Sequence, residues 1–480
     1  MRIPRAYNRS GSGIGFLVAW SGTLIGLIVA TNYSTLFSST PSVWGYVLIL
    51  GISSAVCFGV MVMGVPFSVQ IVKQIDLLEI PVYMTLTNLF LIGITGVAVY
   101  FDPSLLILPS TADLPASLLL ITASLWALWG GYALVSLTWR KQNPEARAAR
   151  FSTPSLRRTL ILYGGVLLLR LGLFAAGSGE RFRIGGGLDL FGEWSQWVTY
   201  LRATSWVTLA LILIQVMRGK WGRWLYGTLV IELLMAILTG WASQLIKLAA
   251  LFLAVMVYAR KPPGSRLIVI ALWVLGAFML TPLARFMRGT DQDLDALLRG
   301  VQVVANSDAA NSTWTLFLRR QSAIAQTPAL IMLKTPSVVP YRSLDELMLA
   351  PFSFIPRALW TNKPAYADIG SLVTSQYFGI DPRNGSSAAT FAGNLYMYGG
   401  TALVILVMIA FGAFSAVIYR VFAVPGLLSG QVGLLAAYAG IVIFNLHLGE
   451  GEILGTFQGM LQVSVIFYGA AWWLCPRREG

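Results

Sequence analysis

The chain has 480 residues, of which 56% are hydrophobic and only 11% are charged. Soluble domains carry about 25% charged residues, so this composition, with a mean hydropathy of +0.71, indicates an integral membrane protein. The net charge of +14 raises the question of nucleic acid, but its distribution follows membrane topology and argues against that partner. The two cysteines, Cys57 and Cys475, lie in or beside apolar stretches and predict neither a disulfide nor a thiolate metal site.

About twelve segments are long and apolar enough to cross a bilayer, which requires about 20 residues per helix. The first follows three arginines and imitates a signal peptide, but its apolar stretch is too long and no small-residue cleavage site follows. We therefore expect an uncleaved first helix and an all-α polytopic membrane protein. In chain order, the expected spans are 13–31, 44–65, 81–101, 115–139, 157–176, 198–217, 222–239, 243–259, 266–285, 399–419, 428–447 and 456–475.

The lysines and arginines of the short loops fix the expected orientation, because cytoplasmic loops carry an excess of both. If the N-terminus is cytoplasmic, nearly all of these residues fall in inside loops, and the short outside loops hold only Arg181 and Arg183. We therefore expect both termini inside. The chain then divides into nine helices in residues 1–285, an extracytoplasmic loop at 286–398 with short interfacial helices at 295–305 and 313–335, and three helices in residues 399–480.

Basic residues gather in this loop and at the outer ends of the spans. The loop holds Arg288, Arg319, Arg320, Arg357 and Lys363, and the spans hold Arg170, Arg202, Lys247 and Arg285. Because a charge inside a bilayer is costly, the span residues face either a partner or a polar cavity. Glu232 is the expected counter-ion for Arg170 or Lys247. One interpretation is a set of structural ion pairs and snorkelling side chains. The other is a pocket for a diphosphate anchored in the outer leaflet, since guanidinium groups bind phosphate oxygens bidentately.

Several side chains are candidates for a general base. His447, the single histidine, lies at the outer end of the eleventh span, where it either accepts a proton or is an interfacial residue at a helix end. The rival carboxylates are Asp345, Glu346, Asp368 and Asp381. Asp291, Asp293 and Asp295 alternate in a pattern that is only weakly typical of a cation site. We expect no metal and no cofactor, because arginines can neutralise a leaving diphosphate.

Three motifs are absent: the phosphate-binding G-x-x-x-x-G-K-[ST], the zinc-binding H-E-x-x-H and the nucleophile elbow G-x-S-x-G. Transport driven by ATP, zinc-dependent proteolysis and serine hydrolysis therefore lack support. An outward-facing site also has no access to cytosolic nucleotide sugars, which favours a lipid-linked donor.

The chain resembles the Wzy-type O-antigen and exopolysaccharide repeat-unit polymerases, which are GT-C-like membrane glycosyltransferases. The resemblance covers mainly residues 220–420. It rests on the number of spans, on the long outer loop before the last three, and on four local segments. These are Ile355-Pro-Arg-Ala-Leu-Trp360, Lys363-Pro364, Ser386 to Gly400, and Leu238-Thr-Gly240.

The resemblance implies transfer of a glycan from undecaprenyl diphosphate to another lipid-linked repeat unit, outside the bacterial inner membrane and without nucleotide. Family members use outer-loop arginines, a role that falls here to Arg357 and then to Arg319 and Arg320. They often carry an arginine after the Thr-Gly turn, where this chain offers Lys247. The implied partners are undecaprenyl-diphosphate-linked glycans, membrane lipid, a chain-length regulator and a flippase, with no nucleic acid.

Three other functions stay open. An O-antigen ligase shares the architecture and characteristically uses an outer-loop histidine, which would make His447 catalytic. A flippase or secondary transporter would be non-enzymatic, with repeats and interrupted helices around a midplane site. The sequence also permits a structural scaffold.

Overall fold

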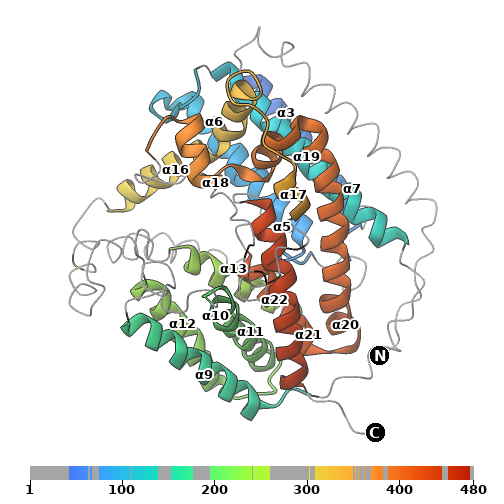
Figure 1. The fold of residues 1–480 in the computed structure, drawn as a ribbon. Coiled ribbons are helices and arrows are strands. Elements are labelled where there is room, and N and C mark those ends of the chain that lie inside the picture. The colour runs from blue at the N-terminus through green and yellow to red at the C-terminus, as the bar shows by residue number, and fades with distance from the viewer. Residues whose placement is uncertain are drawn as a thin grey trace.

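A computed structural model describes most of the helical body. Among the described residues every regular element is a helix, and no strand occurs (Figure 1). The described ranges are 43–62, 65–67, 75–109, 111–138, 153–176, 195–239, 242–259, 309–349, 369–381, 388–445 and 452–475, with the single residues 302, 352, 355, 360 and 362.

The α-helices are α3 (Val43–Val62), α5 (Ile80–Leu86), α6 (Ile94–Phe101), α7 (Leu114–Thr138), α9 (Leu156–Ala175), α10 (Ser195–Arg202), α11 (Thr204–Met217), α12 (Gly227–Leu238), α13 (Ala242–Tyr258), α16 (Ala309–Lys334), α17 (Asp345–Leu349), α18 (Ile369–Leu372), α19 (Thr390–Ile418), α20 (Val424–Ser429), α21 (Val432–Phe444) and α22 (Ile453–Leu474). Wider π-helical turns occupy η1 (Thr87–Gly93), η7 (Val373–Tyr377) and η9 (Tyr419–Ala423). Short 3₁₀ turns form η2 (Pro103–Leu105), η3 (Thr111–Asp113) and η5 (Arg223–Tyr226).

Five helical stretches in the described part are long and apolar enough to cross a membrane: Leu114–Thr138, Leu156–Ala175, Val198–Met217, Thr390–Ser429 and Ile453–Leu474. Shorter apolar helices occur at Gly45–Ala55, Ser243–Tyr258 and Val432–Phe444. Each of the eight overlaps an expected span, and the all-α class is confirmed for the described residues. The expected spans 81–101 and 222–239 are helical but are not among these stretches, and the expected spans 13–31 and 266–285 lie outside the described residues, so the total of twelve stays a prediction.

Glycines bring α7 and α19 into direct backbone contact. A Cβ on Gly131 of α7 would lie 1.8 Å from the carbonyl oxygen of Ile409, and one on Gly412 of α19 would lie 2.0 Å from that of Leu128. Only glycine fits at both positions, and small residues allow such close helix approach inside membranes. These two helices make the most extensive helix–helix contact among the described residues, and α16 packs against both (Figure 1).

Helix α16 is packed into the body rather than confined to a surface loop. Its residues Ser322 and Ala325 to Ile331 are buried against α6, α7 and α19. Gln326 explains how a polar residue is accommodated: its Oε1 accepts from the backbone N–H of Ile107 at 2.7 Å, and its Nε2 donates to the carbonyl of Leu105 at 2.7 Å. Residues 286–398 therefore contribute a core helix close to the position expected for an interfacial one at 313–335.

Helices α9 to α13 lie beside α21 and α22, on the other side of the body from α6 and α16 (Figure 1). The start of α9 meets the end of α22, where the backbone N–H of Ser155 donates to the carbonyl of Leu474 at 3.0 Å. The opposite end of α22 begins at Ile453, just after the α21–α22 connection. We call this end of the body the α22 start.

Candidate functional site

Four of the nine residues expected to form the site are described. Lys247 on α13 and Arg170 on α9 are largely buried, whereas Arg319 and Arg320 on α16 have exposed side chains. The two α16 arginines are therefore accessible to solvent, whereas Lys247 and Arg170 are largely shielded from it. The other five, Arg285, Arg288, Arg357, Lys363 and His447, lie outside the described residues.

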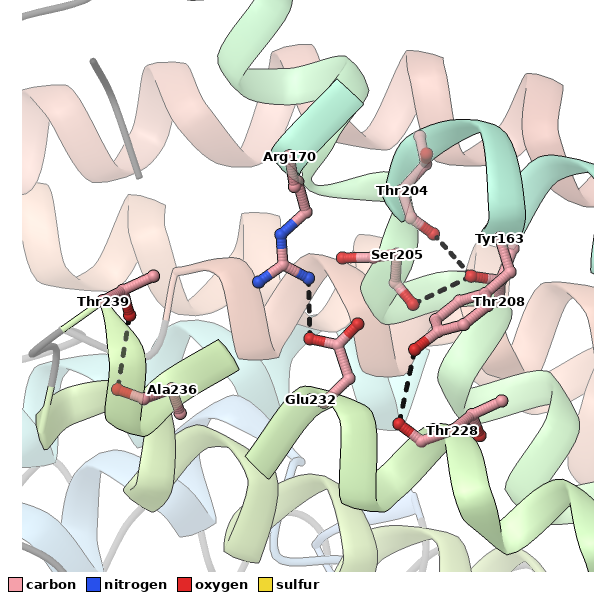
Figure 2. A network of polar contacts seen from close by, with 9 residues as sticks. All are labelled: Tyr163, Arg170, Thr204, Ser205, Thr208, Thr228, Glu232, Ala236 and Thr239. Atoms are coloured by element: carbon pink, nitrogen blue, oxygen red, sulfur yellow. Dashed lines mark hydrogen bonds and ion pairs between the residues drawn. The ribbon is translucent and has the colours of Figure 1, made fainter. Parts of the chain in front are cut away.

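Arg170 and Glu232 form a buried ion pair between α9 and α12 (Figure 2). The Nη1 of Arg170 lies 2.6 Å from the Oε2 of Glu232, and the two side chains are 11% and 4% exposed. Nearby, the Tyr163 hydroxyl donates to the carbonyl of Thr228 at 3.3 Å and also ties α9 to α12. The expectation that Glu232 neutralises one of the buried cations is confirmed, and its partner is Arg170.

The threonine hydroxyl groups near this pair are bonded to the backbone of their own helices. Thr208 of α11 donates to the carbonyl of Ser205 at 2.9 Å, and Thr239 donates to that of Ala236 at 3.3 Å (Figure 2). These bonds satisfy polar groups within apolar surroundings and do not compete for the ion pair.

Lys247 is held at the end of α21. Its side chain is 7% exposed, and its Nζ donates to the carbonyl of Phe444, the last residue of α21, at 3.1 Å. The same nitrogen lies 6.0 Å from the centroid of the Phe444 ring, which Tyr200 of α10 contacts edge-on at 5.5 Å. A cation suits this position because a helix C-terminus carries partial negative charge.

Arg202 of α10 is close enough to Lys247 for the two positive charges to repel each other. Two cations that share a partly desolvated site favour an anion between or beside them, because that anion offsets both the repulsion and the lost hydration. Lys247 and Arg202 are therefore one candidate group for binding an anion.

A second candidate group for binding an anion lies around Arg342. Its Nη2 is 2.6 Å from both carboxylate oxygens of Glu346, and the Tyr398 hydroxyl donates to Glu346 Oε2 at 2.7 Å. The guanidinium also lies 5.3 Å from the centroid of the Tyr398 ring. Within the described part of the chain, the buried Nε and Nη1 of Arg342 have no hydrogen-bond partner. Unpaired buried donors cost about 1–3 kcal/mol each, so an oxygen-bearing ligand would stabilise this arrangement.

Asn394 connects this group to the first turn of α22. Its Oδ1 accepts from the backbone N–H of Ile453 at 3.4 Å, while its buried Nδ2 has no partner among the described residues. One turn further along α19, Tyr398 lies close enough to Glu452 for an electrostatic interaction with that carboxylate. Asn394, Tyr398 and Glu452 therefore gather at the α22 start.

Helix α19 is interrupted directly after Tyr398. Gly400 has φ 65° and ψ −162°, a conformation that is essentially restricted to glycine. The Tyr341 hydroxyl would lie 3.1 Å from a Cβ at this position, so the break lies against the same segment that carries Arg342. Sequence reasoning began a span at 399 and missed that the helix starts at Thr390.

The Lys247 and Arg342 groups flank one connection, because α21 ends at Phe444 and Glu452 is the N-cap of α22. The Lys247 group supplies cations, and the Arg342 group supplies a guanidinium with two unpaired N–H donors and lies beside the carboxylates of Glu346 and Glu452. Sequence reasoning weighed Glu346 as a base but missed Arg342, Asn394 and Tyr398. Asn394 and Tyr398 fall within the Ser386–Gly400 segment, which already carried part of the family resemblance and could have pointed to them.

A separate polar cluster lies at the other end of these helices. The Oδ2 of Asp76 accepts from the hydroxyls of Tyr258 and Tyr419 at 2.9 Å and 3.1 Å, and Glu79 accepts from the hydroxyl of Tyr132. Both carboxylates are fully buried. Burial raises the pKa of the Asp76 carboxyl to about 6, although the hydrogen bonds that it accepts act in the opposite direction. Sequence reasoning did not select either carboxylate.

No set of three or more histidine, cysteine, aspartate or glutamate side chains in the described residues is arranged to hold a metal ion. The described residues form an all-helical protein, with five helices that are long and apolar enough to cross a membrane. The chain belongs to the family described as a domain of unknown function (DUF8712), whose match covers residues 178–423, just over half of its length. No curated protein matches the chain, and no solved structure does.

Proposed function

We propose that the protein is a glycosyltransferase that polymerises undecaprenyl-diphosphate-linked repeat units on the outer side of a bacterial inner membrane. The observation that supports this function best is the α22 start, where Lys247 and Arg202 lie on one side of the α21–α22 connection and Arg342 lies on the other. These groups suit a diphosphate, and the neighbouring carboxylates suit a sugar hydroxyl.

In the proposed reaction, an acceptor hydroxyl oxygen forms a bond to the anomeric carbon of the donor glycan. The bond from that carbon to the diphosphate oxygen breaks, and its electron pair leaves with the diphosphate. Lys247, Arg202 and Arg342 stabilise the charge that develops there, which is an electrostatic form of catalysis. Glu452, Glu346 or His447 accepts the proton. Arg357, Arg319, Arg320, Arg285, Arg288 and Lys363 remain proposed contributors, and we propose no metal or cofactor.

The test is extension of purified lipid-linked repeat units in detergent, with neither nucleotide nor ion gradient. We expect longer glycans, with a rate that EDTA leaves unchanged because side chains replace a metal. Arg342→Gln should slow extension by at least about tenfold, as expected for loss of one charge-assisted contact. The matched control is Arg157→Gln, which removes an exposed arginine near the start of α9. The absence of extension, or an equal effect of both variants, would refute the proposal.

A secondary transporter for lipid-linked glycans is the second candidate, because α19 is interrupted at Gly399–Gly400 and Asp76 and Glu79 are buried together. Interrupted helices and buried acidic residues recur in such transporters. Translocation in sealed vesicles that requires a proton or sodium gradient, without glycan extension, would select this function. A ligase would instead transfer the finished glycan to a lipid core acceptor and fail to extend repeat units.

A further inference from the structure

A cavity of about 740 Å³ opens at the end of the body opposite to the α22 start. The last turn of α11, the turn after it and η5 form its walls, which include Met217, Arg218, Trp221, Arg223 and Tyr226. A second cavity of about 270 Å³ lies beside the first and shares Arg218 with it. Neither cavity contributes to the proposed glycosyl transfer site.

The charged groups of the larger cavity are two arginines, and no carboxylate lines either cavity in the described part of the chain. The Nη2 of Arg218 donates to the carbonyl of Tyr258 at 2.8 Å, which fixes this guanidinium at the end of α13. Arg223 is exposed and begins η5. Two arginines on one cavity wall favour a phosphate group, which both can contact through planar pairs of N–H donors.

The surroundings of the cavity are apolar and aromatic. Trp221 and Tyr226 form part of its wall, and the adjoining Trp224 is 70% exposed. Helix α12 follows η5 directly and presents Val230 and Leu234, which are 55% and 48% exposed, one turn apart on one face. Tryptophan and tyrosine are enriched where a membrane helix meets the headgroup layer. The cavity therefore lies where a polar turn joins an apolar face that is open to acyl chains.

We propose that this cavity binds the phosphate of an anionic phospholipid headgroup, with the acyl chains along the exposed face of α12. Arg223 and Arg218 contact the phosphate, Trp221 and Tyr226 contact the glycerol region, and Val230 and Leu234 contact the chains. The chemistry matches basic pockets that select anionic lipids beside membrane helices. The site is independent of the proposed glycosyl transfer, because its residues lie at the other end of the body.

The experiment titrates phosphatidylglycerol into the full-length protein in neutral detergent and counts bound lipids by native mass spectrometry, with thermal unfolding as a second readout. Phosphatidylcholine is the neutral-headgroup control, and inorganic phosphate and pyrophosphate are the soluble anions. Arg223→Gln is the test variant, since the Arg223 side chain is exposed and makes no hydrogen bond or ion pair among the described residues. Arg157→Gln is the matched control, because it removes another exposed arginine at the same end.

We expect phosphatidylglycerol to bind and to raise the unfolding temperature of the wild type and of Arg157→Gln. Arg223→Gln should weaken that binding by about fivefold, as expected when one surface cation near an anionic headgroup is removed. Arg223→Lys should restore part of it. Equal binding of phosphatidylcholine, equal protection by inorganic phosphate, or equal loss in Arg223→Gln and Arg157→Gln would each overturn the proposal. These outcomes do not depend on whether the protein extends glycans.

Discussion

The ammonium group of Lys247 donates to the carbonyl of Phe444, and so a buried cation on α13 is bonded to the C-terminus of α21. This bond gives Lys247 a structural role, since it satisfies a carbonyl that has no partner further along its own helix. The proximity of Arg202 adds a feature that a purely structural lysine does not need, because the second cation opposes the charge of the first. Both features are explained if an anion binds here.

Replacement of Lys247 by methionine should raise the KM for the lipid-diphosphate donor and slow glycan extension by at least about tenfold, since one charge on the anion site is lost. Lys220→Met is the control, because it removes an exposed lysine at the opposite end. Extension kinetics at several donor concentrations measure the effect, and thermal unfolding reports the loss of the Phe444 bond. If stability falls while KM stays at the wild-type value, Lys247 is only structural.

Substitutions in the Arg170–Glu232 pair should change the stability of the fold rather than the affinity for substrate. Arg170→Met alone leaves an uncompensated buried carboxylate and should destabilise the fold by about 3–5 kcal/mol. Arg170→Met combined with Glu232→Leu removes both charges and should be less destabilising than the single change. Thermal unfolding in detergent compares the two, with Arg157→Met as the exposed control. A double variant that loses the sum of both single effects would show that the two charges are not coupled.

Apolar composition explains why most spans were predictable. The expected segments 157–176 and 243–259 agree closely with α9 and α13, because a helix that contacts lipid must be apolar along its length. Helix α16 shows the limit of this reasoning. The sequence predicts an interfacial helix at 313–335, yet the amide of Gln326 in this segment bonds to the backbone of Leu105 and Ile107 inside the body. A partner more than 200 residues away in the chain is not visible in local composition.

The candidate site was predictable only in part. The free-energy cost of placing a charge inside a bilayer identified Lys247, Arg170 and Glu232, because charged residues are rare within apolar segments. They did not decide which cation pairs with Glu232, because that depends on the packing of α9 against α12. Arg342 and Asn394 gave no signal of their own, since one is an ordinary loop arginine in sequence and the other is a neutral amide. Their unpaired donors appear only when the neighbouring residues are in place.

Asp76 predicts how stability depends on pH. Its folded-state pKa of about 6 lies above the unfolded value of about 4, so the folded state binds the proton more tightly between these values. Its contribution to stability is therefore complete below about pH 4 and is lost as pH rises through 6, by about 3 kcal/mol in total. Asp76→Asn should remove this part of the pH dependence of thermal unfolding, whereas Asp345→Asn, at an exposed aspartate, should keep it. An unchanged profile in Asp76→Asn would show that Asp76 stays ionised throughout.

Membrane orientation is the last and broadest prediction, because the proposed reaction requires the α22 start to face outward. Ser337, which is exposed after α16, should lie outside, and Lys220, which is exposed after α11, should lie inside according to the distribution of lysine and arginine. Cysteines placed at these positions can be probed with a membrane-impermeant thiol reagent, since Cys57 and Cys475 are both buried and give little background. We expect Ser337→Cys to label on intact cells and Lys220→Cys to label only after permeabilisation. The reverse pattern would place the Lys247 and Arg342 groups on the cytoplasmic side, and an enzyme that uses donors in the outer leaflet would then be excluded.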